Sequence, residues 1–222
     1  FASFGNGPAV MLLHGGMGNS NNFGHQVPAL LDAGHRVVVW DTRGHGRSSW
    51  DDGEFSYVKL AEDAFAVFDR LELARAAIVG WSDGACTGLA MAKMAPERVS
   101  GVLFFACNVD ASGSWPFEMT PVIENCLVRH KRDNAALSPD PAQFEAMSQA
   151  LQVMQSSQPN YSAGDLREIA VPVTAVIGEG DEFIRPAHIR YIAETIPRGR
   201  YVEMVGVSHF APVQRPDAFN EV

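Results

Sequence analysis

A serine in a turn bounded by glycines is the residue of this chain best suited to nucleophilic chemistry. Ser82 lies at the centre of Gly80-Trp81-Ser82-Asp83-Gly84, between an apolar segment predicted as a strand and a small-residue segment predicted as a helix. Such a sharp turn strains the serine backbone, and the glycines leave room where a side chain would collide with neighbouring backbone. The motif alone is a weak signal, but its place between strand and helix predicts that Ser82 is a nucleophile.

A serine hydroxyl attacks a carbonyl efficiently only when a neighbouring base takes its proton. Among the seven histidines, His209 follows the last predicted strand and is therefore expected at the same edge of the sheet as Ser82. Asp181 follows the preceding strand, just past a glycine turn, and is predicted to orient the imidazole. Asp110, after the fourth predicted strand, is the alternative acid. The order Ser82, Asp181, His209 thus predicts a catalytic triad.

The tetrahedral intermediate of such an attack needs hydrogen-bond donors directed at its oxyanion. One predicted donor is the backbone N–H of Asp83, directly after the nucleophile. The second is expected from the glycine-rich segment 14–19, where Gly16 and Met17 are both candidates. The side chains of Trp81 and Asp83 are candidate substrate contacts. A carboxylate at position 83 can either attract an ammonium group or satisfy polar groups inside the protein.

The segments that must position these residues alternate between strand-like and helix-like patterns. This alternation predicts an α/β fold with a mostly parallel, doubly wound sheet, whose active site lies at the carboxyl ends of the strands. The predicted strands are 9–13, 35–40, 76–80, 99–106, 173–177 and 201–205, and the predicted helices are 23–33, 57–73, 85–94, 188–196 and one that begins at 217.

The alternation stops between about residues 108 and 166, a stretch too long for an ordinary connection. It contains two helix-like pieces, 121–133 and 141–155. We therefore predict a small helical cap, residues 108–166, inserted into a core made of residues 1–107 and 167–222.

Composition argues against several classes of function. The chain has 222 residues, a formal net charge of −9 and no block of Lys and Arg, so we expect no nucleic-acid or membrane partner. No apolar run approaches the roughly 20 residues needed to cross a bilayer. The spacing of Cys86, Cys107 and Cys126 is typical of neither a disulfide framework nor a zinc site, and predicts thiols in a reducing, cytoplasmic setting. We expect no cofactor or metal, and a monomer or small homo-oligomer.

Together these motifs resemble the α/β-hydrolase family along the whole chain. The resemblance is carried by the glycine loop 14–18, the segment 41–48, the turn 80–84, the segment 178–181 and the pair 208–209. It implies an α/β-hydrolase fold with a nucleophile elbow at the turn. Within the family, the turn resembles that of the valacyclovir-hydrolase (biphenyl-hydrolase-like) branch. In that branch the acid after the serine, matched here by Asp83, is associated with substrates that carry an α-amino group.

These residues predict a cofactor-free serine esterase that cleaves a small carboxylic ester, lactone or related acyl substrate through an acyl-enzyme. Carbon–carbon bond hydrolysis and perhydrolysis on the same triad are alternatives, since fold does not determine function. An alternative of another class is a hydrolase-like receptor for a small ligand. Haloalkane dehalogenase and epoxide hydrolase chemistry are disfavoured, because both place an Asp where this chain has Ser82.

Overall fold

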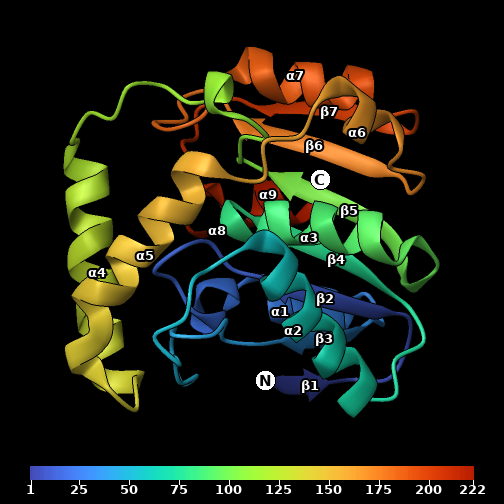
Figure 1. Cartoon of the computed structure of the whole chain (residues 1–222). Helices are drawn as coiled ribbons and strands as arrows, with labels where there is room; N and C mark the ends of the chain where they lie inside the picture. Colours follow the sequence, from blue (N-terminus) through green and yellow to red (C-terminus); the bar gives the residue numbers. More distant parts are fainter.

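A single seven-stranded sheet forms the centre of the molecule in the computed structural model, which describes residues 1–222 (Figure 1). The strand order is β1-β3-β2-β4-β5-β6-β7, and every neighbouring pair is parallel except β1 and β3. The α/β fold class predicted from the sequence is therefore confirmed. The strands are β1 (Ala2–Phe4), β2 (Ala9–Leu13), β3 (Arg36–Val39), β4 (Ala76–Trp81), β5 (Val99–Phe105), β6 (Val173–Gly178) and β7 (Gly199–Met204).

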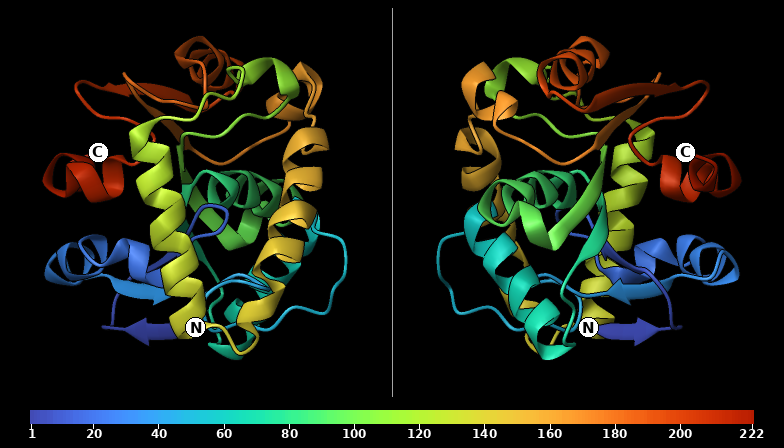
Figure 2. Two further views of the ribbon diagram at one scale, coloured as in Figure 1. Left: turned by 90° about the vertical axis from the view of Figure 1, so that its left-hand side faces the viewer. Right: turned by 90° about the vertical axis from the view of Figure 1, so that its right-hand side faces the viewer.

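Helices cover both faces of this sheet, which is why its inner strands are almost continuously apolar. Figure 2 shows α2 and α3 on one face and α1 with α9 on the other. No helix is both long enough and apolar enough to span a membrane. The helices are α1 (Gln26–Asp32), α2 (Tyr57–Arg70), α3 (Asp83–Met94), α4 (Pro121–Leu137), α5 (Phe144–Ser157), α6 (Ala163–Arg167), α7 (Pro186–Thr195), α8 (Ala211–Gln214) and α9 (Pro216–Asn220).

Several short elements were not predicted from the sequence, among them the four-residue helix α8. β1 has three residues and pairs antiparallel with β3 at the edge of the sheet, with Ala2 opposite Val39. The five-residue helix α6 precedes β6. All three elements are too short for a periodic hydrophobic pattern to appear. The first predicted helix was placed too early: a 3₁₀ turn occupies 20–23, and α1 begins only at Gln26.

Helices α4 and α5 lie beyond the carboxyl ends of the parallel strands (Figure 1). Each buries one face, because residues three, four and seven positions apart lie on the same side of a helix; the buried face of α5 is apolar, whereas that of α4 includes two polar side chains. The buried residues are Ile123, His130 and Asn134 on α4, and Met147, Leu151 and Met154 on α5. The division into a core and a cap of residues 108–166 stays a prediction.

Candidate active site

Ser82 occupies a strained turn between β4 and α3. Its φ is 55° and its ψ is −122°, values that cost a non-glycine residue of the order of 1–3 kcal/mol. The backbone N–H of Ser82 donates to the Phe105 carbonyl over 2.8 Å, and its carbonyl accepts from the N–H of Ala85 over 2.7 Å. These bonds hold the strained conformation in place.

Close packing makes glycine necessary on both sides of Ser82, as the sequence predicted. A Cβ at Gly80 would collide with the backbone of Ala85. A Cβ at Gly84 would collide with the carbonyl oxygen of Leu13, the last residue of β2. The first turn of α3 therefore lies directly against the end of the neighbouring strand.

Asp181 and His209 come together at the carboxyl ends of β6 and β7. Oδ2 of Asp181 lies 2.9 Å from Nδ1 of His209, and both side chains are buried. Oδ1 of Asp181 accepts from the backbone N–H groups of Phe183, over 2.9 Å, and Ile184, over 2.7 Å. Because a carboxylate only accepts, the proton of a neutral His209 sits on Nδ1 and leaves Nε2 as the acceptor. The imidazole is thus held in the form that can take a proton from a serine.

The alternative acid, Asp110, is placed differently. It is the N-cap of the short 3₁₀ turn 111–113, and its carboxylate accepts from the N–H of Ser112 over 2.8 Å. It makes no hydrogen bond to His209.

Ser82 lies in the same region as His209 but is not hydrogen-bonded to it, since no such bond of 3.5 Å or less joins the two side chains. The ring of Trp81, directly before Ser82, lies 6.3 Å from the His209 ring. Hydrogen bonds to a nucleophile are often long without substrate and shorten in the substrate complex. The structure therefore joins two members of the predicted triad directly and places the third nearby.

Aromatic side chains surround the His209 imidazole, and sequence analysis identified only one of them. Phe183 meets the imidazole edge-on with ring centres 4.7 Å apart, and Phe210 does so at 5.5 Å. Trp81 is buried, packs edge-on against Phe210, and its indole Nε1 has no hydrogen-bond partner. Trp81 therefore packs against the imidazole, and a contact between Trp81 and substrate stays a prediction.

The glycine-rich loop after β2 lies against Ser82 and Asp83. A Cβ at Gly15 would lie 3.1 Å from Cβ of Ser82, and a Cβ at Gly16 would lie 2.5 Å from Oδ2 of Asp83. Met17 has a left-handed φ of 60°, which is uncommon outside glycine. The loop predicted to supply an oxyanion donor is thus beside the nucleophile.

His14 fixes the start of this loop. Its Nε2 accepts from the backbone N–H of Thr42 over 3.0 Å, so the proton is on Nδ1, which donates to the Gly15 carbonyl over 2.7 Å. Burial lowers the pKa of His14, which agrees with the neutral ring that this hydrogen-bond pattern requires. His14 therefore has a structural part in the loop.

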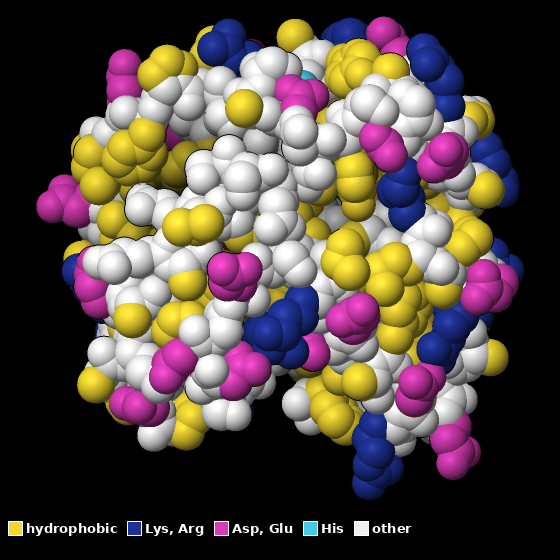
Figure 3. Space-filling model, viewed as in Figure 1, with side chains coloured by type: hydrophobic (Ala, Val, Ile, Leu, Met, Phe, Trp, Pro, Cys, Tyr) yellow, Lys and Arg dark blue, Asp and Glu magenta, His cyan; other side chains and the backbone are white.

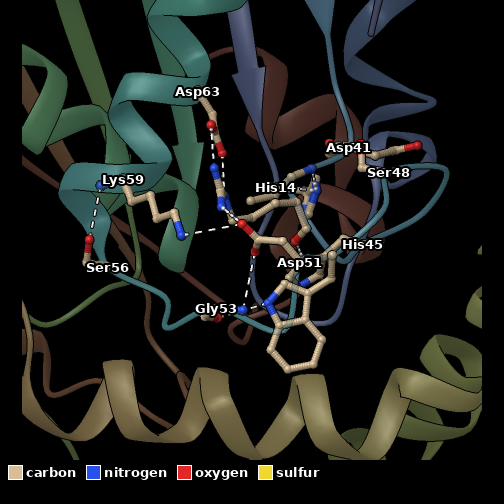
Figure 4. A network of polar contacts seen from close by, with 12 residues as sticks. His14, Asp41, His45, Ser48, Asp51, Gly53, Ser56, Lys59 and Asp63 are labelled. Atoms are coloured by element: carbon tan, nitrogen blue, oxygen red, sulfur yellow. Dashed lines mark hydrogen bonds and ion pairs between the residues drawn. The ribbon is translucent and has the colours of Figure 1, made fainter. Parts of the chain in front are cut away.

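The segment 41–48 is held by charged hydrogen bonds (Figure 4). Burial raises the pKa of Asp41, but hydrogen bonds from Ser20 and Arg47 outweigh burial and bring it down to about 2. Arg43 forms two bonds to Asp63, of 2.6 and 2.7 Å. These contacts tie the segment to α2.

Asp83 is buried, and both of its carboxylate oxygens are occupied by donors from the protein. The Tyr57 hydroxyl donates to Oδ1 and the Gln155 amide donates to Oδ2, each over 2.8 Å. Burial raises the pKa of Asp83 above its ordinary value, and these two hydrogen bonds offset only part of that rise. This geometry supports the structural alternative for the Asp83 side chain, and a contact with a substrate ammonium stays a prediction.

An apolar surface lies beside His209. Figure 3 shows hydrophobic side chains gathered at the upper left, around the loop that leads into α4. Trp115, Phe117 and Met119 in this loop are exposed, Phe117 by 65%. The ring of Phe117 stacks on Phe183 at 6.4 Å, and Phe183 in turn contacts His209. Aromatic contacts therefore run from the surface to the imidazole.

Comparison with known proteins agrees with this fold. Residues 8–125 match the family model described as alpha/beta hydrolase fold. The chain is 28% identical to "Putative non-heme bromoperoxidase BpoC" of Mycobacterium tuberculosis, covering 97% of this chain and 92% of that protein. It is 26% identical to 3-oxoadipate enol-lactonase 2 of Acinetobacter baylyi, covering 99% and 89%. A solved meta-cleavage product hydrolase from Pseudomonas fluorescens IP01 is similar in fold, with a TM-score of 0.81 and 21% identity over 99% of this chain and 90% of that one.

Proposed function

The chain belongs to the α/β-hydrolase fold family and is an enzyme of that family, and we propose that it is a serine hydrolase for small carboxylic esters or lactones. The observation that carries this proposal is the 2.9 Å contact between Asp181 and His209, at the strand ends where the turn holds Ser82. Acyl transfer requires an imidazole whose Nε2 can accept the proton of a nearby serine, and Ser82 is half-buried in the same region as His209.

In the proposed mechanism, Oγ of Ser82 attacks the carbonyl carbon while Nε2 of His209 takes the hydroxyl proton. Asp181 stabilises the imidazolium that forms. Collapse of the tetrahedral intermediate breaks the bond to the leaving-group oxygen, which receives the proton from His209, and leaves an ester of Ser82. A water molecule then attacks this ester with His209 again as the base, releasing the acid and restoring Ser82.

Two backbone donors are proposed for the oxyanion. The N–H of Asp83 is the first of helix α3 and has no acceptor within the helix. It also lies at the positive end of the helix dipole, which favours a developing negative charge. The second donor is the N–H of Gly16 or Met17, in the loop that lies against Ser82. Removal of one oxyanion donor typically lowers kcat about 10²- to 10³-fold.

The surroundings of His209 support a neutral substrate with an apolar part. Phe183 and the exposed Phe117 lead from the surface to the imidazole. No Arg or Lys forms a hydrogen bond or ion pair with Ser82, Asp181 or His209. The enol-lactonase relative supports lactones as a second group of substrates beside open esters.

The experiment compares the enzyme with Ser82→Ala on a panel of p-nitrophenyl esters, lactones and aminoacyl esters. We expect steady turnover of esters or lactones by the enzyme and none by the variant, with the same melting temperature. Undiminished activity of Ser82→Ala would overturn the proposal. A single turnover that ends in a stable adduct would indicate a receptor instead of a hydrolase.

Perhydrolysis is a second candidate, favoured by the similarity to the protein named as a bromoperoxidase. Here hydrogen peroxide, instead of water, attacks the ester of Ser82 and releases a peroxycarboxylic acid. The test adds peroxide and bromide to the ester assay and measures bromination of a phenol dye. Bromination that requires both the ester and Ser82 would support this activity.

A further inference from the structure

The Asp83 side chain joins three segments that meet beside the nucleophile. Its Oδ1 accepts from Tyr57 at the start of α2, and its Oδ2 accepts from Gln155 near the end of α5. Thr87, one turn along α3, donates its hydroxyl to the Asp83 carbonyl over 2.8 Å. A carboxylate this deeply buried is stable only when both oxygens are hydrogen-bonded, so its partners are constrained in position.

The glycine-rich loop after β2, residues 14–19, is the proposed source of the second oxyanion donor and is called the oxyanion loop below. It packs against the hydrogen bond between Asp83 and Gln155. A Cβ at Gly16 would be 2.5 Å from Oδ2 of Asp83 and 2.9 Å from Nε2 of Gln155. The loop backbone therefore contacts the donor and the acceptor of the same hydrogen bond. A shift of Gln155 would remove the surface against which Gly16 packs.

Helix α5 makes further contacts with the oxyanion loop and with the start of α2. The Ser148 hydroxyl approaches Sδ of Met17 at 3.5 Å. At its end, Gln158 accepts from the N–H of Tyr57 over 3.3 Å and donates to the Phe55 carbonyl over 3.5 Å. Thus α5 touches the oxyanion loop at two points and the start of α2 at a third.

We propose that Asp83 is a positioning residue, which through Gln155 couples the placement of helix α5 to the spacing between the two oxyanion donors. This inference rests on the proposed serine hydrolase function. One donor is the N–H of Asp83 itself, and the other belongs to the loop that packs on the Asp83–Gln155 bond. Because both carboxylate oxygens already accept from the protein, this assignment also removes Asp83 as a receptor for a substrate ammonium group.

Gln155→Ala tests the coupling, with Gln149→Ala as the matched control. Both glutamines are exposed residues of α5, but only the Gln155 amide reaches Asp83, whereas the Gln149 amide donates to Glu145 of its own helix over 3.4 Å. We expect Gln155→Ala to lower kcat for a p-nitrophenyl ester about 10- to 100-fold, since misplacement of reacting groups by 1 Å can cost that much. KM should change much less, because the binding of the ground-state ester does not depend on the oxyanion donors.

Two further variants separate positioning from simple destabilisation. Tyr57→Phe removes the other donor and should lower kcat in the same way. Asp83→Asn can keep both bonds if the Gln155 amide turns over, so it should retain more activity than Asp83→Ala. A change that is only structural would lower the melting temperature of Gln155→Ala and leave kcat per folded enzyme unchanged.

The outcomes are distinguishable. The coupling is wrong if Gln155→Ala matches Gln149→Ala in kcat, or if its whole effect is on KM. It is also wrong if α-amino esters are hydrolysed much faster than their des-amino analogues and Asp83→Asn abolishes that preference. Ser82→Ala in the same assay tests the proposed function separately, since an inactive Ser82→Ala with a fully active Gln155→Ala would contradict the coupling alone.

Discussion

Asp181→Asn offers the sharpest test of the catalytic arrangement, because the substitution changes charge and hydrogen bonding but hardly changes shape. In the native chain Oδ1 accepts from two backbone N–H groups, those of Phe183 and Ile184, and Oδ2 accepts from Nδ1 of His209. An asparagine can satisfy the two backbone donors only if its oxygen takes the Oδ1 position. Its NH₂ group then faces Nδ1 of His209.

This orientation forces the imidazole into the other tautomer. Nδ1 must accept from the new amide, so the imidazole proton moves to Nε2. A protonated Nε2 cannot accept the proton of Ser82. The opposite amide orientation would leave the N–H groups of Phe183 and Ile184 without acceptors, at about 1–3 kcal/mol for the buried N–H of Ile184 alone. That exceeds the small difference between imidazole tautomers, so the inactive form should predominate. We expect kcat to fall about 10⁴-fold, which corresponds to about 5.5 kcal/mol of barrier.

The assay is kcat for a p-nitrophenyl ester, measured from pH 6 to 10 beside the melting temperature of each variant. Asp110→Asn is the matched control, because Asp110 follows β5 and caps a 3₁₀ turn away from His209. We expect that variant to keep its activity. An Asp181→Asn enzyme with more than about a tenth of native kcat would refute the reasoning, as would a loss confined to Asp110→Asn.

The remaining predictions concern stability. Gly84→Ala should destabilise the fold by about 3 kcal/mol or more in urea unfolding, since its Cβ would meet backbone of Leu13 that cannot move aside. Gly164→Ala is the control, because its Cβ would meet only Ser162 Oγ at 3.4 Å. Equal stability of the two variants would contradict the close packing at Gly84. Stability should also fall in mild acid, because burial brings the pKa of His45 to about 3 and that of His130 to about 4. The unfolded chain binds more protons below its histidine pKa of 6.5, so this stability is complete above pH 6.5 and is lost as the pH falls toward 3, about 2 kcal/mol for each histidine by pH 5. Urea midpoints at pH 8 and pH 5 measure the loss, and the difference should shrink when both histidines are replaced by Gln.

The sequence was most informative where the chemistry depends on neighbouring residues. The strand before Ser82 and the helix after it were predictable because both patterns are local. The need for glycine at positions 80 and 84 was also predictable, because a turn that sharp leaves no room for Cβ atoms there. The strand ends also placed Asp181 and His209 at one edge, since parallel strands have their carboxyl ends together. The predicted acid and base are in contact in the structure.

Partners that are distant in the sequence were not predictable. Asp83 had two possible roles, and its donors, Tyr57 and Gln155, are 26 and 72 residues away along the chain. Neither donor belongs to a motif. Likewise, Phe183 lies in no pattern that indicates contact with an imidazole, although its ring meets that of His209. The short strand β1 was missed because pairing with β3, and not an apolar pattern of its own, defines it.

These distant contacts bear more on the proposed oxyanion site than the motif does. The motif fixes the strained backbone of Ser82 and hence the place of the first proposed donor, the N–H of Asp83. It does not fix the second proposed donor, the N–H of Gly16 or Met17, because that loop follows another strand and its Gly16 packs on a hydrogen bond made by α5. On this proposal, the distance between the donors is set by tertiary contacts that can differ between chains with the same turn. Chains that share this turn can thus differ in rate and substrate even when their nucleophile, base and acid coincide.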